Sequence, residues 1–222
     1  MVALLVILGL SFNAIAHAGI WVRVNDTTLR FSGQIQKGDL EKLENILKPE
    51  DKTLFLDSTG GDAQVGVRLA IKLLPNKLNI VVDGICASSC ANYLFPVGYN
   101  KEIRRGWVGF HGNVTAFLAI DWQKVVVKLK EDKNLTDEQI AEFHQRLLAS
   151  SKLEEELFAE LGVSQTLFDR TQTPDKGMHN DVAYSFLVPK PETFIRYGIQ
   201  RVKGSQDLTY RNAELGLNNL YD

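Results

Sequence analysis

The sequence predicts an α/β fold in which helices flank a largely parallel sheet. Short apolar runs at 53–57 and 78–82 indicate buried strands, and stretches at 39–47 and 65–74 carry apolar residues at helical spacing. The connections between these segments are short. A strand, a helix and a second strand joined in this way form the right-handed crossover unit of parallel sheets. Loops at the carboxyl ends of such strands are where functional sites usually form.

Length and composition indicate one globular domain. The chain has 222 residues, of which 45% are hydrophobic, so it can bury a full core. Its net charge is −2, and Lys and Arg alternate with Asp and Glu without a basic cluster. Nothing in this pattern indicates a nucleic-acid partner. We expect a single domain over residues 19–222, without internal repeats.

Residues 1–18 resemble a secretory signal. They hold an apolar run from Val2 to Leu10, lack Lys and Arg, and end in Ala16-His17-Ala18, the small-x-small pattern after which signal peptidases cut. We therefore expect export, with cleavage after Ala18 and no membrane attachment of the mature chain. Because a basic segment before the apolar run is missing, two alternatives stay open. One is an uncleaved anchor through residues 2–15, and the other is a start codon placed too far downstream.

The elements after this segment can be assigned in order. Gly19–Val24 and Thr28–Ser32 alternate apolar and polar residues, as the half-buried strands of a hairpin do, and Asn25-Asp26 supplies the turn. Asp39 can cap the first helix, which ends before Pro49.

Two turns of small residues follow the next two strands. The first is Ser58-Thr59-Gly60-Gly61-Asp62, and the second runs from Gly84 to Ser89 and leads into a buried helix. Both turns lie at carboxyl ends of predicted parallel strands, so they can converge on one point. Gly61 can present its N–H without a side chain in the way, as an oxyanion site requires.

Ser88 is the candidate nucleophile. In a strand, turn and helix arrangement it lies at the first positions of the helix, where free backbone N–H groups and the helix dipole favour negative charge. Ser89 supplies the next N–H group. The alternative is that these small residues only allow a helix to pack closely.

Cys86 and Cys90, the only cysteines, flank this serine. In an oxidising compartment they could form a bridge that persists. They lie four residues apart around a helix start, however, and disulfide geometry is demanding. We therefore favour two small buried thiols that pack beneath Ser88.

His111 follows a predicted strand at 103–110 and precedes Gly112. Its side chain is therefore exposed enough to react, and the strand holds it in place. This makes it a candidate general base, and a hydrogen-bonded structural histidine is the alternative. The other histidines, His17, His144 and His179, show no ligand spacing with each other or with the cysteines. We expect neither a metal site nor another cofactor.

The C-terminal half is predicted to be mostly helical. One helix is expected at 116–130, a second after a capping box of Thr136 and Gln139, and a third at 153–161. The acidic run Glu154–Glu156 is expected on the solvated face of the third helix.

Less regular structure is expected after these helices. The polar segment 169–179 predicts a loop, 182–188 a strand, and 191–198 a short helix that ends at Gly198. The last 20 or so residues carry little signal, and we expect a partly ordered tail there.

Three motifs, taken together, resemble those of the Clp-type serine proteases within the wider crotonase-like superfamily. They are Asp57-Ser-Thr-Gly-Gly-Asp62, Gly84-Ile-Cys-Ala-Ser-Ser-Cys-Ala91 and Val108-Gly-Phe-His111. The order and spacing agree with that family, and the resemblance covers about residues 28–200. It is closest to exported bacterial Clp-like proteins whose nucleophile turn has the pattern Cys-Ala-Ser-x-Cys.

The resemblance implies a ClpP/crotonase-like fold of repeated β-β-α units and a serine peptidase site. Ser88 would be the nucleophile, His111 its general base, and the N–H groups of Gly61 and Ser89 the oxyanion hole.

The third catalytic residue is where this sequence departs from the family pattern. Clp proteases place an aspartate shortly before a Phe-Leu-x-x-x-Glu helix, which Phe186-Leu187 and Glu192 resemble here with one additional residue between them. The expected aspartate position falls near residues 183–185, and Asp181 lies a few residues early. Asp181 is the candidate, with Asn180 or a backbone carbonyl as alternatives for orienting His111.

The resemblance also implies a periplasmic homo-oligomer that cleaves peptides or unfolded polypeptides without an ATP-driven unfoldase. The main alternative is a catalytically weak or inactive crotonase-fold module that binds a peptide or protein partner in the same cleft. A Ser/Lys dyad is disfavoured because His111 occupies the base position. An acyl-thioester-processing crotonase is disfavoured because an exported enzyme would rarely meet coenzyme A thioesters.

Overall fold

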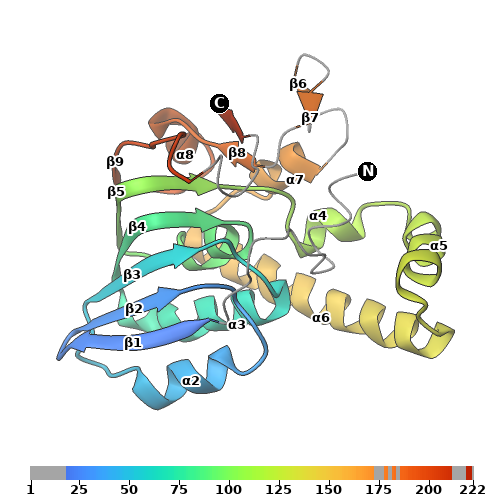
Figure 1. Ribbon diagram of the computed structural model, residues 1–222, viewed down its shortest axis with the longest axis horizontal. Coiled ribbons are helices and arrows are strands. Elements are labelled where there is room, and N and C mark those ends of the chain that lie inside the picture. Colours follow the sequence, from blue (N-terminus) through green and yellow to red (C-terminus); the bar gives the residue numbers. More distant parts are fainter. Residues whose placement is uncertain (1–18, 173–177, 180–181, 184–185, 212–218, 222) are drawn as a thin grey trace.

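The computed structural model describes residues 19–172, 178–179, 182–183, 186–211 and 219–221, so the expected signal at 1–18 lies outside the described residues. Its centre is a six-stranded sheet in which the first pair is antiparallel and the other pairs are parallel (Figure 1). The predicted α/β class, with helices flanking a mostly parallel sheet, is confirmed. In spatial order the strands are β1 (Ile20–Asn25), β2 (Thr28–Ser32), β3 (Thr53–Ser58), β4 (Asn79–Ala87), β5 (Asn100–Gly109) and β9 (Val202–Gly204).

The predicted N-terminal hairpin is present, but its two strands are buried to different degrees. In β2 every second residue is buried, including Leu29 and Phe31. In β1 Trp21 packs on Phe31, whereas Ile20 and Val22 on the opposite face are 54% and 45% exposed. This difference follows from position, because β1 is the edge strand of the sheet.

Helices α2 (Asp39–Ile46), α3 (Ala63–Leu73) and α6 (Asp137–Leu161) lie along one side of the sheet (Figure 1). α3 contacts both of the others, and apolar residues of all three helices join the main core. The N-terminus of α3 is capped by Asp62, whose carboxylate accepts hydrogen bonds from the N–H groups of Gln64 and Val65. Asp39 does not cap α2, because Gly38 occupies the cap position and Asp39 is the first helical residue.

The helices expected at 116–130 and 153–161 have other boundaries. α4 (Val114–Leu118) and α5 (Trp122–Lys133) replace the first, because Asp121 caps a new helix through the N–H of Gln123. The second is the C-terminal part of α6, which has 25 residues and is capped by the left-handed Gly162, with a φ of 68°. The predicted capping box of Thr136 and Gln139 is confirmed.

The C-terminal segment contains more regular structure than the sequence indicated. α7 (Thr166–Gln172) covers the start of the expected loop, and the expected strand corresponds to β7 (Val182–Ala183) and β8 (Phe186–Val188). In the segment where a partly ordered tail is expected, β9 joins the main sheet and β10 pairs with β8, two strands that the sequence did not predict. The remaining elements are β6 (Met178–His179), α8 (Pro191–Arg196) and β10 (Asn219–Tyr221).

Within the described residues, no helix combines the length and the apolar character needed to cross a membrane.

Candidate active site

Ser88 lies at a sharp turn between β4 and a short π-helix, η2 (Cys90–Leu94). Its φ is 55°, a left-handed conformation that is uncommon for residues other than glycine and recurs at functional sites. The turn is held to the neighbouring strand because the N–H of Ser88 donates to the carbonyl of Gly109 at 3.1 Å. The predicted strand, turn and helix around Ser88 are therefore present, and β4 extends to Ala87 rather than ending near Val82.

His111 follows the end of β5, and its ring contacts the Ser88 side chain. The Nε2 atom lies 2.6 Å from the Oγ atom of Ser88, and the Nδ1 atom lies 2.7 Å from the carbonyl oxygen of Gly112. A carbonyl only accepts hydrogen bonds, so Nδ1 carries the proton and Nε2 has a free lone pair. This tautomer can accept the hydroxyl proton of Ser88, as a general base must.

The surroundings of His111 favour its neutral form. Burial lowers the pKa of the ring to about 4, and the hydrogen bond to Gly112 offsets only part of that effect. The ring also packs against Phe186, with the ring centres 5.7 Å apart. His111 is therefore unprotonated at neutral pH and can take a proton.

The Gly60-Gly61 turn after β3 contacts the Ser88 turn directly. A Cβ atom on Gly60 would lie 2.6 Å from the carbonyl oxygen of Ala87, so the two turns pack backbone to backbone. The hydroxyl of Ser89 donates to the carbonyl of Gly61 at 2.8 Å. The sequence expectation that two turns converge here matches this arrangement.

The backbone of Gly61 is oriented toward the serine. Ile35 pairs with this turn through the carbonyl of Gly60 and the N–H of Asp62, which leaves the polar groups of Gly61 on the other side. No residue that the structure describes accepts the N–H of Gly61 or of Ser89. Both N–H groups are thus available to an oxyanion. Gly61, Ser88, Ser89 and His111 all line one small cavity of about 10 Å³.

Cys86 and Cys90 form a disulfide, with Cα atoms 5.2 Å apart, so the expectation of two free thiols is wrong. The left-handed turn at Ser88 is the physical reason, because it brings the end of β4 back against the start of η2. Both cysteines are fully buried. The bridge therefore closes a short covalent ring around the candidate nucleophile.

Glu154 is fully buried, which corrects the expectation of a solvated face for this residue, whereas Glu155 and Glu156 are exposed as expected. Its carboxylate accepts from the N–H of Val114 at 2.9 Å, from the N–H of Thr115 at 2.8 Å, and from the hydroxyls of Thr115 and Tyr93. Burial raises the pKa of Glu154, and burial together with this carboxylate raises the pKa of Tyr93. Glu154 thereby ties the segment after His111 to η2.

Asn92 in η2 is a second residue that sequence reasoning missed. Its amide nitrogen donates to the carbonyls of His111 and Gly112 at 3.3 and 3.5 Å. It is 1% exposed and lines the cavity that holds Ser88. Asn92 therefore helps to hold the carbonyl that orients the imidazole.

Asp181 and Asn180, two sequence candidates for orienting His111, lie outside the described residues. The third candidate, a backbone carbonyl, is in place as that of Gly112. In the part of the chain that the structure describes, no three His, Cys, Asp or Glu side chains form a group that could hold a metal ion.

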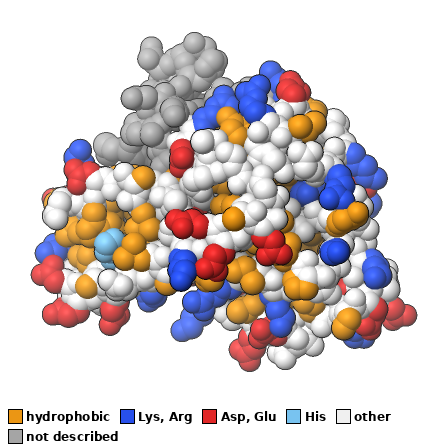
Figure 2. Space-filling view, turned by 180° about the vertical axis from the view of Figure 1, so that it is seen from behind, with side chains coloured by type: hydrophobic (Ala, Val, Ile, Leu, Met, Phe, Trp, Pro, Cys, Tyr) orange, Lys and Arg blue, Asp and Glu red, His pale blue; other side chains and the backbone are white. Residues whose placement is uncertain are grey.

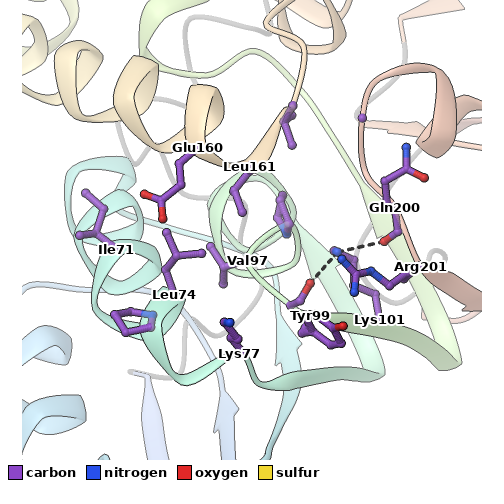
Figure 3. Close-up of a pocket in the computed structure, with 15 residues that line it drawn as sticks. Ile71, Leu74, Lys77, Val97, Tyr99, Lys101, Glu160, Leu161, Gln200 and Arg201 are labelled. Atoms are coloured by element: carbon purple, nitrogen blue, oxygen red, sulfur yellow. Dashed lines mark hydrogen bonds between the residues drawn. The ribbon is translucent and has the colours of Figure 1, made fainter.

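A separate cavity of about 580 Å³ lies at the opposite end of β5 (Figure 3). Its most buried charged residue is Lys101, which donates to the carbonyls of Gly98 and Gln200 at 2.6 and 3.0 Å. Burial lowers the pKa of Lys101 to about 8. Because this ammonium already binds two structural carbonyls, the Ser88 cavity is the stronger candidate for chemistry.

A scan against protein-family models and a search of curated proteins gave no match to this chain.

Proposed function

We propose that this protein is a serine hydrolase, and specifically a peptidase, with the ClpP/crotonase-like fold. The observation that carries the proposal is the 2.6 Å contact between Ser88 Oγ and His111 Nε2 on a left-handed turn. The free N–H groups of Gly61 and Ser89 beside the same cavity support it.

The proposed reaction begins with attack of Ser88 Oγ on a substrate carbonyl carbon while His111 Nε2 takes the hydroxyl proton. The oxygen that gains negative charge accepts hydrogen bonds from the N–H groups of Gly61 and Ser89. The imidazolium, steadied at Nδ1 by the carbonyl of Gly112, then protonates the leaving amine. Water cleaves the acyl ester by the same steps, which restores Ser88.

Export to a periplasm is part of the proposal, and the Cys86–Cys90 bridge supports it. Disulfides form and persist in oxidising compartments and are rare in the cytosol. Homo-oligomerisation is proposed as well. Figure 2 shows hydrophobic side chains gathered at the end of the molecule where α5 and α6 lie. Val127 of α5 and Leu148 of α6 are 51% and 44% exposed. Such surfaces often mark contacts between proteins.

The small volume beside Ser88 favours a second candidate function, a module that binds polypeptide without cleaving it. A cavity of about 10 Å³ has room for about one water-sized group, such as a single carbonyl oxygen, and not for the neighbouring residues of a peptide. In this case Ser88→Ala would leave polypeptide binding unchanged.

The test is digestion of a reduced and alkylated polypeptide, with its folded form as the comparison. We expect wild-type protein to release peptides from the unfolded form only, as detected by mass spectrometry. Ser88→Ala should release none, and Ser205→Ala, which alters an exposed serine outside the cavity, should match wild type. Cleavage that survives in Ser88→Ala would contradict the proposed nucleophile, and cleavage by neither protein would favour the binding module.

A further inference from the structure

A larger groove of about 730 Å³ adjoins the catalytic cavity. The groove and the cavity share Gly61 and Ala63, so the groove begins next to the proposed oxyanion donor. Its walls come from the loop at 34–37, from the first turns of α3 and from the middle of α6. A polypeptide with one carbonyl at Ser88 would therefore extend into this groove.

Three cationic side chains line the groove, each from a different wall: Lys37, Arg68 and Arg146. All three are exposed, and none has an ion-pair partner among the residues that the structure describes. Many other cations of this protein do pair with carboxylates, such as Arg23 with Asp51.

Among the described residues that line the groove, only Asp62 has a carboxylate, and that group already accepts hydrogen bonds from the backbone. It accepts the N–H groups of Gln64 and Val65 at the start of α3. The groove therefore carries a net positive charge, although the whole chain has a net charge of −2. A local field of this sign attracts and orients anionic groups.

We infer that this groove selects acidic polypeptide segments, with Asp or Glu side chains close to the bond presented to Ser88. The inference rests on the proposed function for the cleavage step, whereas the binding preference itself depends only on the groove. The half-buried ring of Phe143 in the lining adds apolar contact surface for a neighbouring apolar residue.

The expected preference is moderate because the cations are exposed. A single exposed ion pair changes affinity about two- to fivefold, so two such pairs give about tenfold. Screening should reduce this preference to about twofold at 0.5 M salt, where the Debye length is shorter than at physiological ionic strength.

The test measures binding to Ser88→Ala protein, so that turnover does not consume the ligand. Three fluorescent acetylated peptides share one Ala/Ser/Leu background and differ only in a central Glu-Glu, Gln-Gln or Lys-Lys pair. We expect the Glu-Glu peptide to bind about tenfold more tightly than the Gln-Gln peptide, and the Lys-Lys peptide to bind most weakly. Adding Arg68→Gln and Arg146→Gln together should bring the Glu-Glu and Gln-Gln peptides within about twofold. Adding Arg196→Gln, which removes an exposed arginine outside the groove, should leave the preference intact.

Equal affinities for the Glu-Glu and Gln-Gln peptides, or no measurable binding of any of the three, would overturn the inference. Retention of the acidic preference in the double arginine variant would also overturn it. A fluorophosphonate probe on wild-type protein tests the hydrolase proposal separately. A preference for the acidic peptide without labelling of Ser88 would support the proposed groove and contradict the proposed hydrolase. Labelling of Ser88 without that preference would support the hydrolase and contradict the groove.

Discussion

The hydroxyl of Ser89 donates a hydrogen bond to the carbonyl of Gly61 at 2.8 Å. This bond joins the turn after β3 to the turn after β4, and each turn offers one free N–H to the cavity at Ser88. The separation of the two proposed oxyanion donors is therefore set by a direct contact between the turns that carry them. Donors held in place before reaction are what makes an oxyanion hole effective.

Gly61→Ala should disrupt this arrangement. The new Cβ atom would lie 2.2 Å from the carbonyl oxygen of Ile35, and the φ of 139° disfavours any side chain. We expect the rate of fluorophosphonate labelling to fall at least about 100-fold, the usual effect of losing one oxyanion donor. Gly38→Ala is the matched control, because Gly38 is also left-handed but a Cβ atom there would meet nothing within 4 Å. Equal labelling rates in the two variants would count against Gly61 as a donor.

The pH dependence of labelling should follow the low pKa of His111. The ring acts as a base only when neutral, and burial sets its pKa at about 4. We expect a constant rate from neutral pH down to about 5 and a half-maximal rate near pH 4. The free energy of unfolding should also decrease as the pH falls from about 6.5, the pKa of an unfolded histidine, toward 4. A half-maximal rate near pH 6.5 would contradict the lowered pKa of His111.

Glu154→Gln should destabilise the protein. The carboxylate accepts hydrogen bonds from two backbone N–H groups and two hydroxyls, and an amide would turn an N–H toward some of these donors. We expect the free energy of unfolding in urea to fall by about 2 to 3 kcal/mol. Glu155→Gln is the control, because Glu155 is the exposed neighbour on α6 and should change stability by less than about 0.5 kcal/mol. Similar losses in both variants would contradict the role given to Glu154.

Opening the Cys86–Cys90 bridge should lower both stability and the reactivity of Ser88. A covalent loop of this length contributes about 2 kcal/mol by the chain-entropy model. We expect a reductant to decrease the free energy of unfolding by about that amount and to slow fluorophosphonate labelling. In Cys86→Ser/Cys90→Ser protein, both quantities should start low and not respond to reductant. Labelling that is equally fast in the oxidised and reduced proteins would show that the bridge does not support the Ser88 turn.

Much of the fold followed from local pattern. The alternation at 28–32 and the apolar runs in β3 and β4 indicate strands because they reflect which side chains are buried. The helices could be predicted because each has one apolar face, which repeats at helical spacing. The break between α4 and α5 was not predicted, because the segments on both sides of it have helical spacing. Asp121 separates them by capping the start of α5. β9 and β10 were not predicted because two short strands gain their stability from partners far away in the sequence.

The site could be predicted to a similar extent. Ser88 and His111 were predictable as candidates because parallel strands bring their carboxyl ends to one edge. The disulfide depends on the backbone at Ser88, which residue types alone do not fix. The burial of Glu154 could have been predicted, since this residue lies at helical spacing from Leu147 and Leu157, which are also buried. The roles of Asn92 and the Gly112 carbonyl depend on tertiary contacts without a local signal.

The most direct test of the central claim, an activated serine at position 88, is labelling of the purified protein with a fluorophosphonate probe. Wild type, Ser88→Ala and His111→Ala are compared, and the labelled residue is identified by mass spectrometry. The geometry predicts an adduct on Ser88 in wild type, none in Ser88→Ala, and at least about 100-fold slower labelling in His111→Ala. No adduct on Ser88 in folded wild-type protein between about pH 5 and 9, or equally fast labelling in His111→Ala, would contradict it.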